Sequence, residues 1–281
     1  MQGQIRLPIV AGAFYPSEPS ELSRYLDSLL GEGFAPASLP LPHPAGLIVP
    51  HAGYPYSGAV AAAGFKEIAK RGTPRTVILL GANHTGFGAT VSLGDHAGWE
   101  TPLGIVRTKG ELIERLAEKG LVIDNSAFIR EHSLEVELPF IARIWGDEVG
   151  LVPICVMSMG DWKVYEEAGQ LIAEALGDEL GLIVASSDFT HYEPDELARS
   201  LDRSAIEMIL ALDGRGFIEE WMRRRLSICG AGAIATLIAA CNSLGLTSAR
   251  LLDYRTSGDT TGDRSAVVGY AAISFTKETD D

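Results

Sequence analysis

The sequence predicts an α/β fold in which a largely parallel or mixed central sheet is flanked by helices. Short apolar runs alternate with longer segments of helical spacing, the pattern of a sheet covered by helices. The runs are apolar throughout, as expected of strands buried on both faces. No break in composition divides the 281 residues, so residues 1–281 are expected to form a single domain.

Five apolar runs are predicted to be strands: 45–50, 75–81, 149–157, 180–186 and 265–275. Four segments between them have helical spacing, and several end at a glycine, which commonly stops a helix. These predicted helices are 57–72, 132–146, 161–177 and 193–213.

The net charge of −14, from 23 basic and 37 acidic residues, disfavours contact with phosphate backbones. We therefore expect no nucleic-acid partner, and the basic run 223–225 is expected to cap the end of an acidic helix. The longest apolar stretch, 230–241, is too short to span a bilayer. The first residues lack the apolar run of a signal peptide, and three cysteines do not suggest a disulfide framework. These features predict a cytoplasmic protein without a membrane partner.

Polar, titratable residues follow three of the predicted strands directly. His51 follows the run 45–50, His84 follows 75–81, and Asp188 and His191 follow 180–186. The carboxyl ends of strands are where open α/β sheets form their ligand crevice. These four side chains are therefore expected to share one pocket.

A single histidine at a strand end is more often structural, but three in one topological position, with His132 at a predicted helix start, indicate a metal site. His43, in a proline-rich loop, and His96, in a hairpin or surface connection, lack this context and are expected to be structural or solvated.

Cys229 lies where an apolar helix is predicted to begin. The positive end of a helix dipole favours a thiolate, so Cys229 is a candidate nucleophile or soft metal ligand. The alternative is a small buried hydrophobic residue, as expected for Cys155 in a strand and Cys241 in a helix.

Residues 230–235 match the letters G-x-G-x-x-A of a dinucleotide-binding fingerprint, but no clear strand precedes them. Close helix packing explains these small residues better, so no nucleotide cofactor is expected. The segment 256–265, rich in glycine and in charged residues, is expected to be either a lid or a turn.

Six blocks of sequence together resemble the Memo family, whose microbial members are also called AmmeMemoRadiSam system protein B. They span nearly the whole chain and occur in order at residues 11–16, 50–58, 80–86, 131–140, 186–192 and 228–234. The resemblance implies the fold of class III extradiol dioxygenases, which are non-haem iron enzymes.

The resemblance also implies roles for particular residues. A mononuclear metal ion would be bound by His51, His84 and Cys229, with Asp188 and His191 in the same pocket and His191 as the acid/base group. Further residues of the matched blocks are expected in or near the pocket: His132, Glu135, Tyr54 and Asn83.

The expected ligand set places a cysteine where the dioxygenases have a glutamate. A thiolate is softer and more easily oxidised than a carboxylate, and we expect iron or copper in preference to zinc. The resemblance further implies radical-SAM and AMMECR1-like protein partners. Animal relatives bind phosphotyrosine peptides through a surface that includes a tryptophan, at the position of Phe14 here.

Three functions are compatible with this pattern. The first is a metal-dependent redox enzyme acting on a small molecule, with His191 oriented by Asp188 to move a proton. The second is a non-catalytic module that binds a peptide or protein in the same pocket. The third is a metal-dependent hydrolase, which would favour zinc and a bound water.

Overall fold

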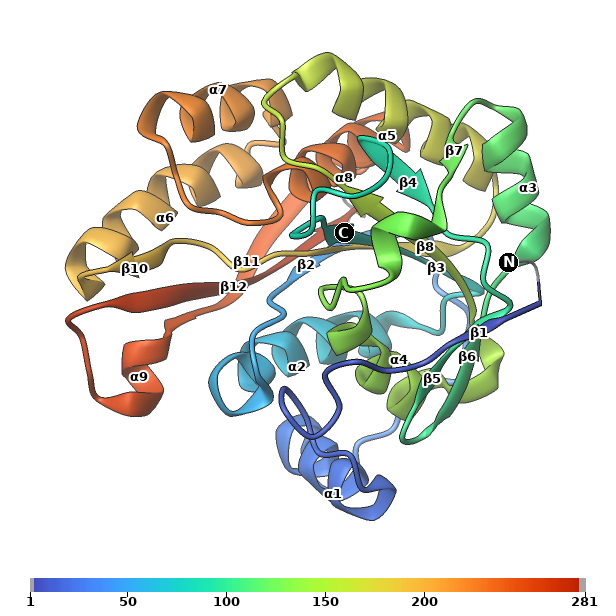
Figure 1. Cartoon of the computed structure of the whole chain (residues 1–281), viewed down its shortest axis with the longest axis horizontal. Coiled ribbons are helices and arrows are strands. Elements are labelled where there is room, and N and C mark those ends of the chain that lie inside the picture. Colours follow the sequence, from blue (N-terminus) through green and yellow to red (C-terminus); the bar gives the residue numbers. More distant parts are fainter. Residues whose placement is uncertain (1–2, 278–281) are drawn as a thin grey trace.

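A central sheet runs through the computed structural model, which describes residues 3–277 (Figure 1). Among these residues the sheet has nine strands. In spatial order, eight of them are β10 (His191–Glu193), β12 (Val267–Thr276), β2 (Ala45–Val49), β9 (Gly181–Ser186), β3 (Thr76–Ala82), β8 (Gly150–Val156), β4 (Val91–Leu93) and β7 (Val122–Ile123). The ninth, β11 (Ser248–Thr256), pairs with β12.

The four central strands β2, β9, β3 and β8 are parallel to one another, whereas β12 is antiparallel to β2 and β4 is antiparallel to β8. The sheet is therefore mixed, and the predicted α/β fold class is confirmed. Four of the predicted strands are these central parallel strands. The fifth, 265–275, is β12, which starts the antiparallel half of the sheet.

Helices cover both faces of the sheet (Figure 1). One face carries α1 (Pro19–Leu30), α2 (Tyr54–Arg71) and α4 (Leu138–Trp145). The other face carries α3 (Gly110–Glu118), α5 (Trp162–Leu176), α6 (Asp195–Leu210), α7 (Gly214–Arg224) and α8 (Ala231–Ser243). Across the described residues, no helix is both long and apolar enough to cross a membrane.

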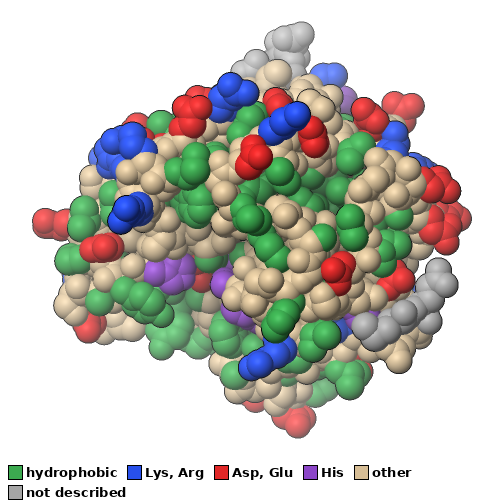
Figure 2. Space-filling model, turned by 45° about the horizontal axis from the view of Figure 1, so that its top comes forward, with side chains coloured by type: hydrophobic (Ala, Val, Ile, Leu, Met, Phe, Trp, Pro, Cys, Tyr) green, Lys and Arg blue, Asp and Glu red, His purple; other side chains and the backbone are tan. Residues whose placement is uncertain are grey.

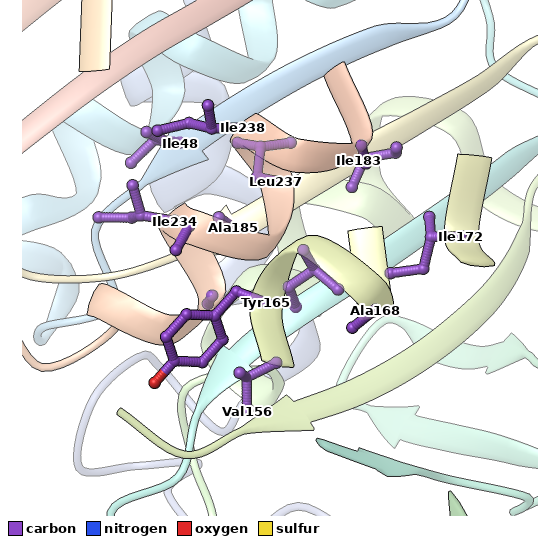
Figure 3. Packing of buried hydrophobic residues seen from close by; sticks show 14 of the residues in the cluster. Ile48, Val156, Tyr165, Ala168, Ile172, Ile183, Ala185, Ile234, Leu237 and Ile238 are labelled. Atoms are coloured by element: carbon purple, nitrogen blue, oxygen red, sulfur yellow. The ribbon is translucent and has the colours of Figure 1, made fainter. Parts of the chain in front are cut away.

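The core on the second face is built around α8, a helix whose residues Ala231 to Cys241 are all buried. Figure 3 shows side chains of α5 and α8 meeting those of the central strands, among them Tyr165, Ile234 and Ile183. Gly169 of α5 allows the two helices to lie close together, because a Cβ there would be 2.5 Å from Ala239 Cβ and 2.7 Å from Ala240 N.

A small second sheet and several short turns complete the chain. The second sheet joins β1 (Ile5–Arg6), β5 (Gly98–Thr101) and β6 (Gly104–Arg107). Three 3-10 turns are Asn125–Phe128, Glu135–Glu137 and Gly146–Glu148. Arg223 and Arg224 lie in the last turn of α7 and pair with Glu220, as predicted for the basic run.

The predicted helix 132–146 was wrong in its start. Residues 135–137 form a 3-10 turn and α4 begins at Leu138. The buried Glu131 carboxylate accepts hydrogen bonds from the backbone N–H groups of His132 and Ser133, which fixes these residues outside the helix. Pro139 then occupies the first turn of α4, where it needs no hydrogen bond.

The sequence did not predict β11, because its residues are polar or half-exposed and lack a continuous apolar run. Residues 256–265 form a turn, which is the second of the two alternatives. They connect β11 to β12 through the short helix α9 (Ser257–Thr261), which Thr256 and Asp259 cap.

The close approach of α5 and α8 gives a test of the packing. Gly169→Ala should lower the free energy of unfolding by about 1–3 kcal/mol, because the added methyl overpacks the contact. Denaturant unfolding would measure this loss. Gly110→Ala is the control, since a Cβ there has open space in a helix. Equal stability of the two variants would contradict the described contact.

Candidate metal centre

The sheet order places the candidate residues at one edge. β2, β9 and β3 are adjacent and parallel, so the segments that follow them leave the sheet side by side. Three potential ligand atoms, one from each of His51, His84 and Cys229, lie within 4.8 Å of one another. His51 Nε2 and Cys229 Sγ are 3.3 Å apart. The three residues predicted to converge are therefore together, although they are far apart in sequence.

His51 is buried and is held at both its backbone and its ring. Its backbone N–H donates to Asp188 Oδ1 at 2.9 Å, and its Nδ1 lies 2.9 Å from Ser186 Oγ. Burial, together with the nearby His84 and His132, lowers the pKa of His51 well below its usual value. The imidazole is thus neutral, which is the form that binds metal ions.

His84 is held by the carboxylate of Glu131. Its backbone N–H donates to Glu131 Oε2 at 2.7 Å, and its Nδ1 lies 2.9 Å from Glu131 Oε1. Burial opposes the charged imidazole, but hydrogen bonds with Cys229 and Glu131 outweigh it and raise the pKa of His84 to about 10. Burial likewise opposes the Glu131 charge, yet the bonds with His84 lower its pKa to about 2.

Cys229 lies just before α8, in contact with the segment that follows β9. Asp188 N donates to its Sγ at 3.3 Å. Burial raises the pKa of Cys229, His84 opposes this effect and the Asp188 carboxylate adds to it. Burial therefore works against the thiolate that the helix terminus was expected to favour. A metal ion or a charged His84 would have to supply that stabilisation.

The glycines that follow Cys229 serve packing, as predicted. A Cβ on Gly230 would lie 2.5 Å from Ser187 Cβ, and one on Gly232 would lie 2.7 Å from Met157 O. Gly230 also donates its N–H to Ser187 Oγ at 3.0 Å. The start of α8 can therefore lie directly against the ends of β9 and β8, which fixes Cys229 beside His51.

Asp188 does not orient His191. Its carboxylate accepts the His51 backbone N–H instead. His191 Nδ1 instead lies 2.7 Å from Phe189 O and 2.9 Å from Ser227 O. Because both neighbours are carbonyls, Nδ1 carries the hydrogen and Nε2 keeps a lone pair.

A bulge sets the direction of His191. The pairing of β10 with β12 shifts between His191 and Glu193, and Tyr192 in between has a left-handed backbone with φ 62°. Such a conformation is unfavourable for a tyrosine, and bulges of this kind re-aim side chains beside functional sites. Tyr192 itself is 77% exposed.

Of the four further pocket candidates, only His132 joins the cluster. Its ring stacks on His84 at a centroid distance of 4.8 Å. Glu135 instead binds the N-terminal segment through Arg6, Ile9, Val10 and Tyr15.

Tyr54 and Asn83 also have structural contacts. The Tyr54 hydroxyl donates to Val136 O in the core, and Asn83 shapes the loop after β3 through Thr85, Gly86 and Phe87. His43 is exposed, and His96 is buried beside Trp99 and Phe128, so its role is structural.

Three contact residues were not predicted from the sequence. Glu131 binds His84, Ser186 binds His51, and Glu137 lies behind Ser186 at 2.8 Å from its Oγ. All three are buried polar residues within matched blocks. Their presence as polar residues inside the matched blocks was the available signal in the sequence. Residue spacing alone, however, does not show which polar residues of a block face the site.

The burial of the cysteines predicts their reactivity. Cys155 and Cys241 have no exposed surface, whereas Cys229 is only partly buried. Limited labelling of the folded, metal-free protein should therefore modify Cys229 first, read by mass spectrometry of peptides. Cys229→Ser should abolish the fast phase. Labelling of Cys155 at a similar rate would contradict the described burial.

Comparison with known proteins gives consistent relatives. The family described as Memo-like protein matches residues 6–274. A MEMO1 family protein of Methanopyrus kandleri is 43% identical over 283 residues, covering 96% of this chain and 98% of the relative. Another, from Nitrosopumilus maritimus, is 40% identical and covers 96% and 99%.

The fold is also found in a solved structure. The crystal structure of an uncharacterized protein from Escherichia coli K12 matches with a TM-score of 0.59 at 13% identity, covering 82% of this chain and 98% of that chain. At this identity the match shows a shared fold. The family match spans nearly all of this chain, and the relatives are aligned over almost their full length. The chain belongs to the Memo family.

Proposed function

We propose that the protein is a metal-dependent oxidoreductase with one metal ion bound by His51, His84 and Cys229. One observation carries this proposal: ligand atoms from three separate segments lie within 4.8 Å of one another. Each imidazole is also held through Nδ1, by Ser186 or by Glu131, so Nε2 is the remaining ligand atom, and at His84 a metal ion would displace its proton. Support of this kind behind the ligands is typical of metal sites.

The ligand chemistry favours iron or copper. Two imidazoles and one thiolate suit ions that accept soft ligands, and three protein ligands leave positions open. His84 is the most exposed of the three, at 34% of its side chain, so a substrate would approach from its side. A bound iron or copper ion would supply the redox chemistry that side chains lack.

His191 is the proposed acid/base residue. The carbonyls of Phe189 and Ser227 fix the hydrogen on Nδ1, so the Nε2 lone pair is available to take a proton from a bound substrate. His191 lies near enough to act electrostatically on both His51 and Asp188. Asp188 holds the His51 backbone and therefore acts on the geometry of the ligands.

Exposed apolar side chains on the segments that leave the sheet at this edge favour an organic substrate. Phe87, Met159 and Tyr192 are 60%, 65% and 77% exposed and lie on the segments that follow β3, β8 and β9. Figure 2 shows histidine side chains reaching the surface beside hydrophobic ones. The same exposed apolar side chains support the second candidate function, a module that binds a peptide without catalysis. Turnover of a bound molecule separates the two functions.

Metal content of anaerobically purified protein tests the proposal. The wild type should retain about one equivalent of iron or copper, and Cys229→Ala and His51→Ala should lose most of it. His43→Ala is the matched control, because His43 is exposed and outside the cluster. Full metal retention in Cys229→Ala would contradict the ligand set, and stoichiometric zinc would favour a hydrolase.

His191→Gln tests the division of roles. This variant should retain the metal at wild-type stoichiometry, because the ring of His191 is anchored to Phe189 and Ser227 rather than to the ligands. Metal analysis alongside His51→Ala gives the comparison. Loss of metal equal to that of His51→Ala would show that His191 is itself a ligand.

A further inference from the structure

The hydroxyl of Ser186 is the meeting point of three buried groups. Its Oγ lies 2.9 Å from His51 Nδ1, 2.8 Å from Ser133 O and 2.8 Å from Glu137 Oε1. All four residues are buried, and Ser186 and Glu137 have no exposed surface. Each of these three contacts is made by a group of the protein itself, so the hydrogens in them come from Ser186, Glu137 and His51.

Counting the hydrogens leaves one arrangement that satisfies all three contacts. A hydroxyl has one hydrogen to donate and two lone pairs to accept with. The Ser133 carbonyl can only accept, so it takes the Ser186 hydrogen. Glu137 and His51 must then each donate to Ser186 Oγ. Glu137 can donate only if its carboxyl group is protonated, and His51 only if Nδ1 carries the hydrogen.

The surroundings of Glu137 agree with a protonated carboxyl group. Its second oxygen, Oε2, is buried and has no hydrogen-bond partner among the described residues. An ionised carboxylate in that position would be left half unsatisfied, at a large cost in free energy. Burial raises the pKa of Glu137 well above its usual value, and the nearby Asp188 adds to the effect.

We propose that Glu137 is a positioning residue: an uncharged carboxylic acid that donates to Ser186 and so fixes the hydrogen of His51 on Nδ1. The Nε2 lone pair of His51 then points toward Cys229 Sγ, 3.3 Å away. This inference rests on the proposed function only where it assigns His51 to a metal; the proton positions belong to the protein alone.

The proposal makes the two imidazoles unequal. His84 is supported by Glu131, whose two carboxylate oxygens accept the backbone N–H groups of His84, His132 and Ser133, the setting of an anion. His51 is supported through a neutral acid and a hydroxyl. An anionic partner increases the basicity of an imidazole ligand, and a neutral partner does so less. His51 is therefore expected to be the weaker electron donor of the pair.

Infrared spectroscopy of the metal-free protein tests the protonation directly. At neutral pH the wild type should show the carbonyl stretch of a protonated carboxylic acid, and Glu137→Gln should remove it. Glu167→Gln is the matched control, because Glu167 is exposed on α5. Absence of the band in the wild type, or its survival in Glu137→Gln, would overturn the proposal.

The His51 tautomer is a second readout that a merely structural role would not change. Nitrogen-15 NMR of labelled, metal-free protein should show His51 protonated on Nδ1 in the wild type and in Glu137→Gln, whose amide can still donate. Glu137→Leu removes the donor and lets the Ser186 hydroxyl turn toward His51, so both tautomers should appear. A proton on Nε2 in the wild type would contradict the proposal.

Copper or iron affinity then connects the proton positions to the site. Glu137→Leu should bind about 10- to 100-fold more weakly than wild type, and Glu137→Gln should stay near wild type. Equal weakening in both variants would contradict the donor role. If the wild type binds neither metal, the proposed function fails, whereas the infrared and NMR results still decide the role of Glu137.

Discussion

The site depends on the parallel register of β2, β9 and β3. Ser186 at the end of β9 is paired with Val49 of β2 on one side and with Gly81 of β3 on the other. The next residue continues the pattern, since Ser187 N donates to Val49 O. This row of three strand ends brings His51 and His84 together, and it places Ser186 directly behind His51. Any shift of register would separate the ligands and disconnect Ser186 from them.

The second requirement is that the polar groups behind the ligands are buried and paired. Glu131 is a buried anion that accepts from His84, His132 and Ser133, and these contacts offset its loss of water. Gly81 leaves room for this arrangement, because a Cβ there would lie 2.2 Å from Leu134 Cδ1 and 2.6 Å from Ser133 Oγ. The loop 131–134 thus packs directly on β3, and its carboxylate reaches the backbone of His84.

The central strands and the convergence of two ligands could be predicted, because both follow from local patterns in the sequence. Continuous apolar runs identify buried strands, and parallel strands place their ends at one edge, so the convergence of His51 and His84 follows from the sequence. The position of Cys229 came from the family resemblance, together with its place before an apolar helix. The small residues of 230–235 were correctly assigned to packing, because no strand precedes them.

The remainder depends on tertiary contacts that spacing does not encode. Asp188 was expected to orient His191, but in the folded chain its carboxylate accepts the His51 backbone N–H instead. The thiol of Cys229 was expected to ionise easily, but burial raises its pKa. Glu131, Ser186 and Glu137 were missed for the same reason. Each of these residues supports a ligand that lies far away in the sequence, and only the folded sheet shows which ligand that is.

X-ray absorption spectroscopy of the metal-loaded protein tests the central claim most directly. The account predicts one sulfur and two imidazole nitrogens in the coordination shell of a single iron or copper ion. In Cys229→Ser the sulfur contribution should disappear while the imidazole contribution of any metal still bound remains. A wild-type spectrum without sulfur, or a sulfur signal unchanged in Cys229→Ser, would contradict the assignment of the metal centre to these three residues.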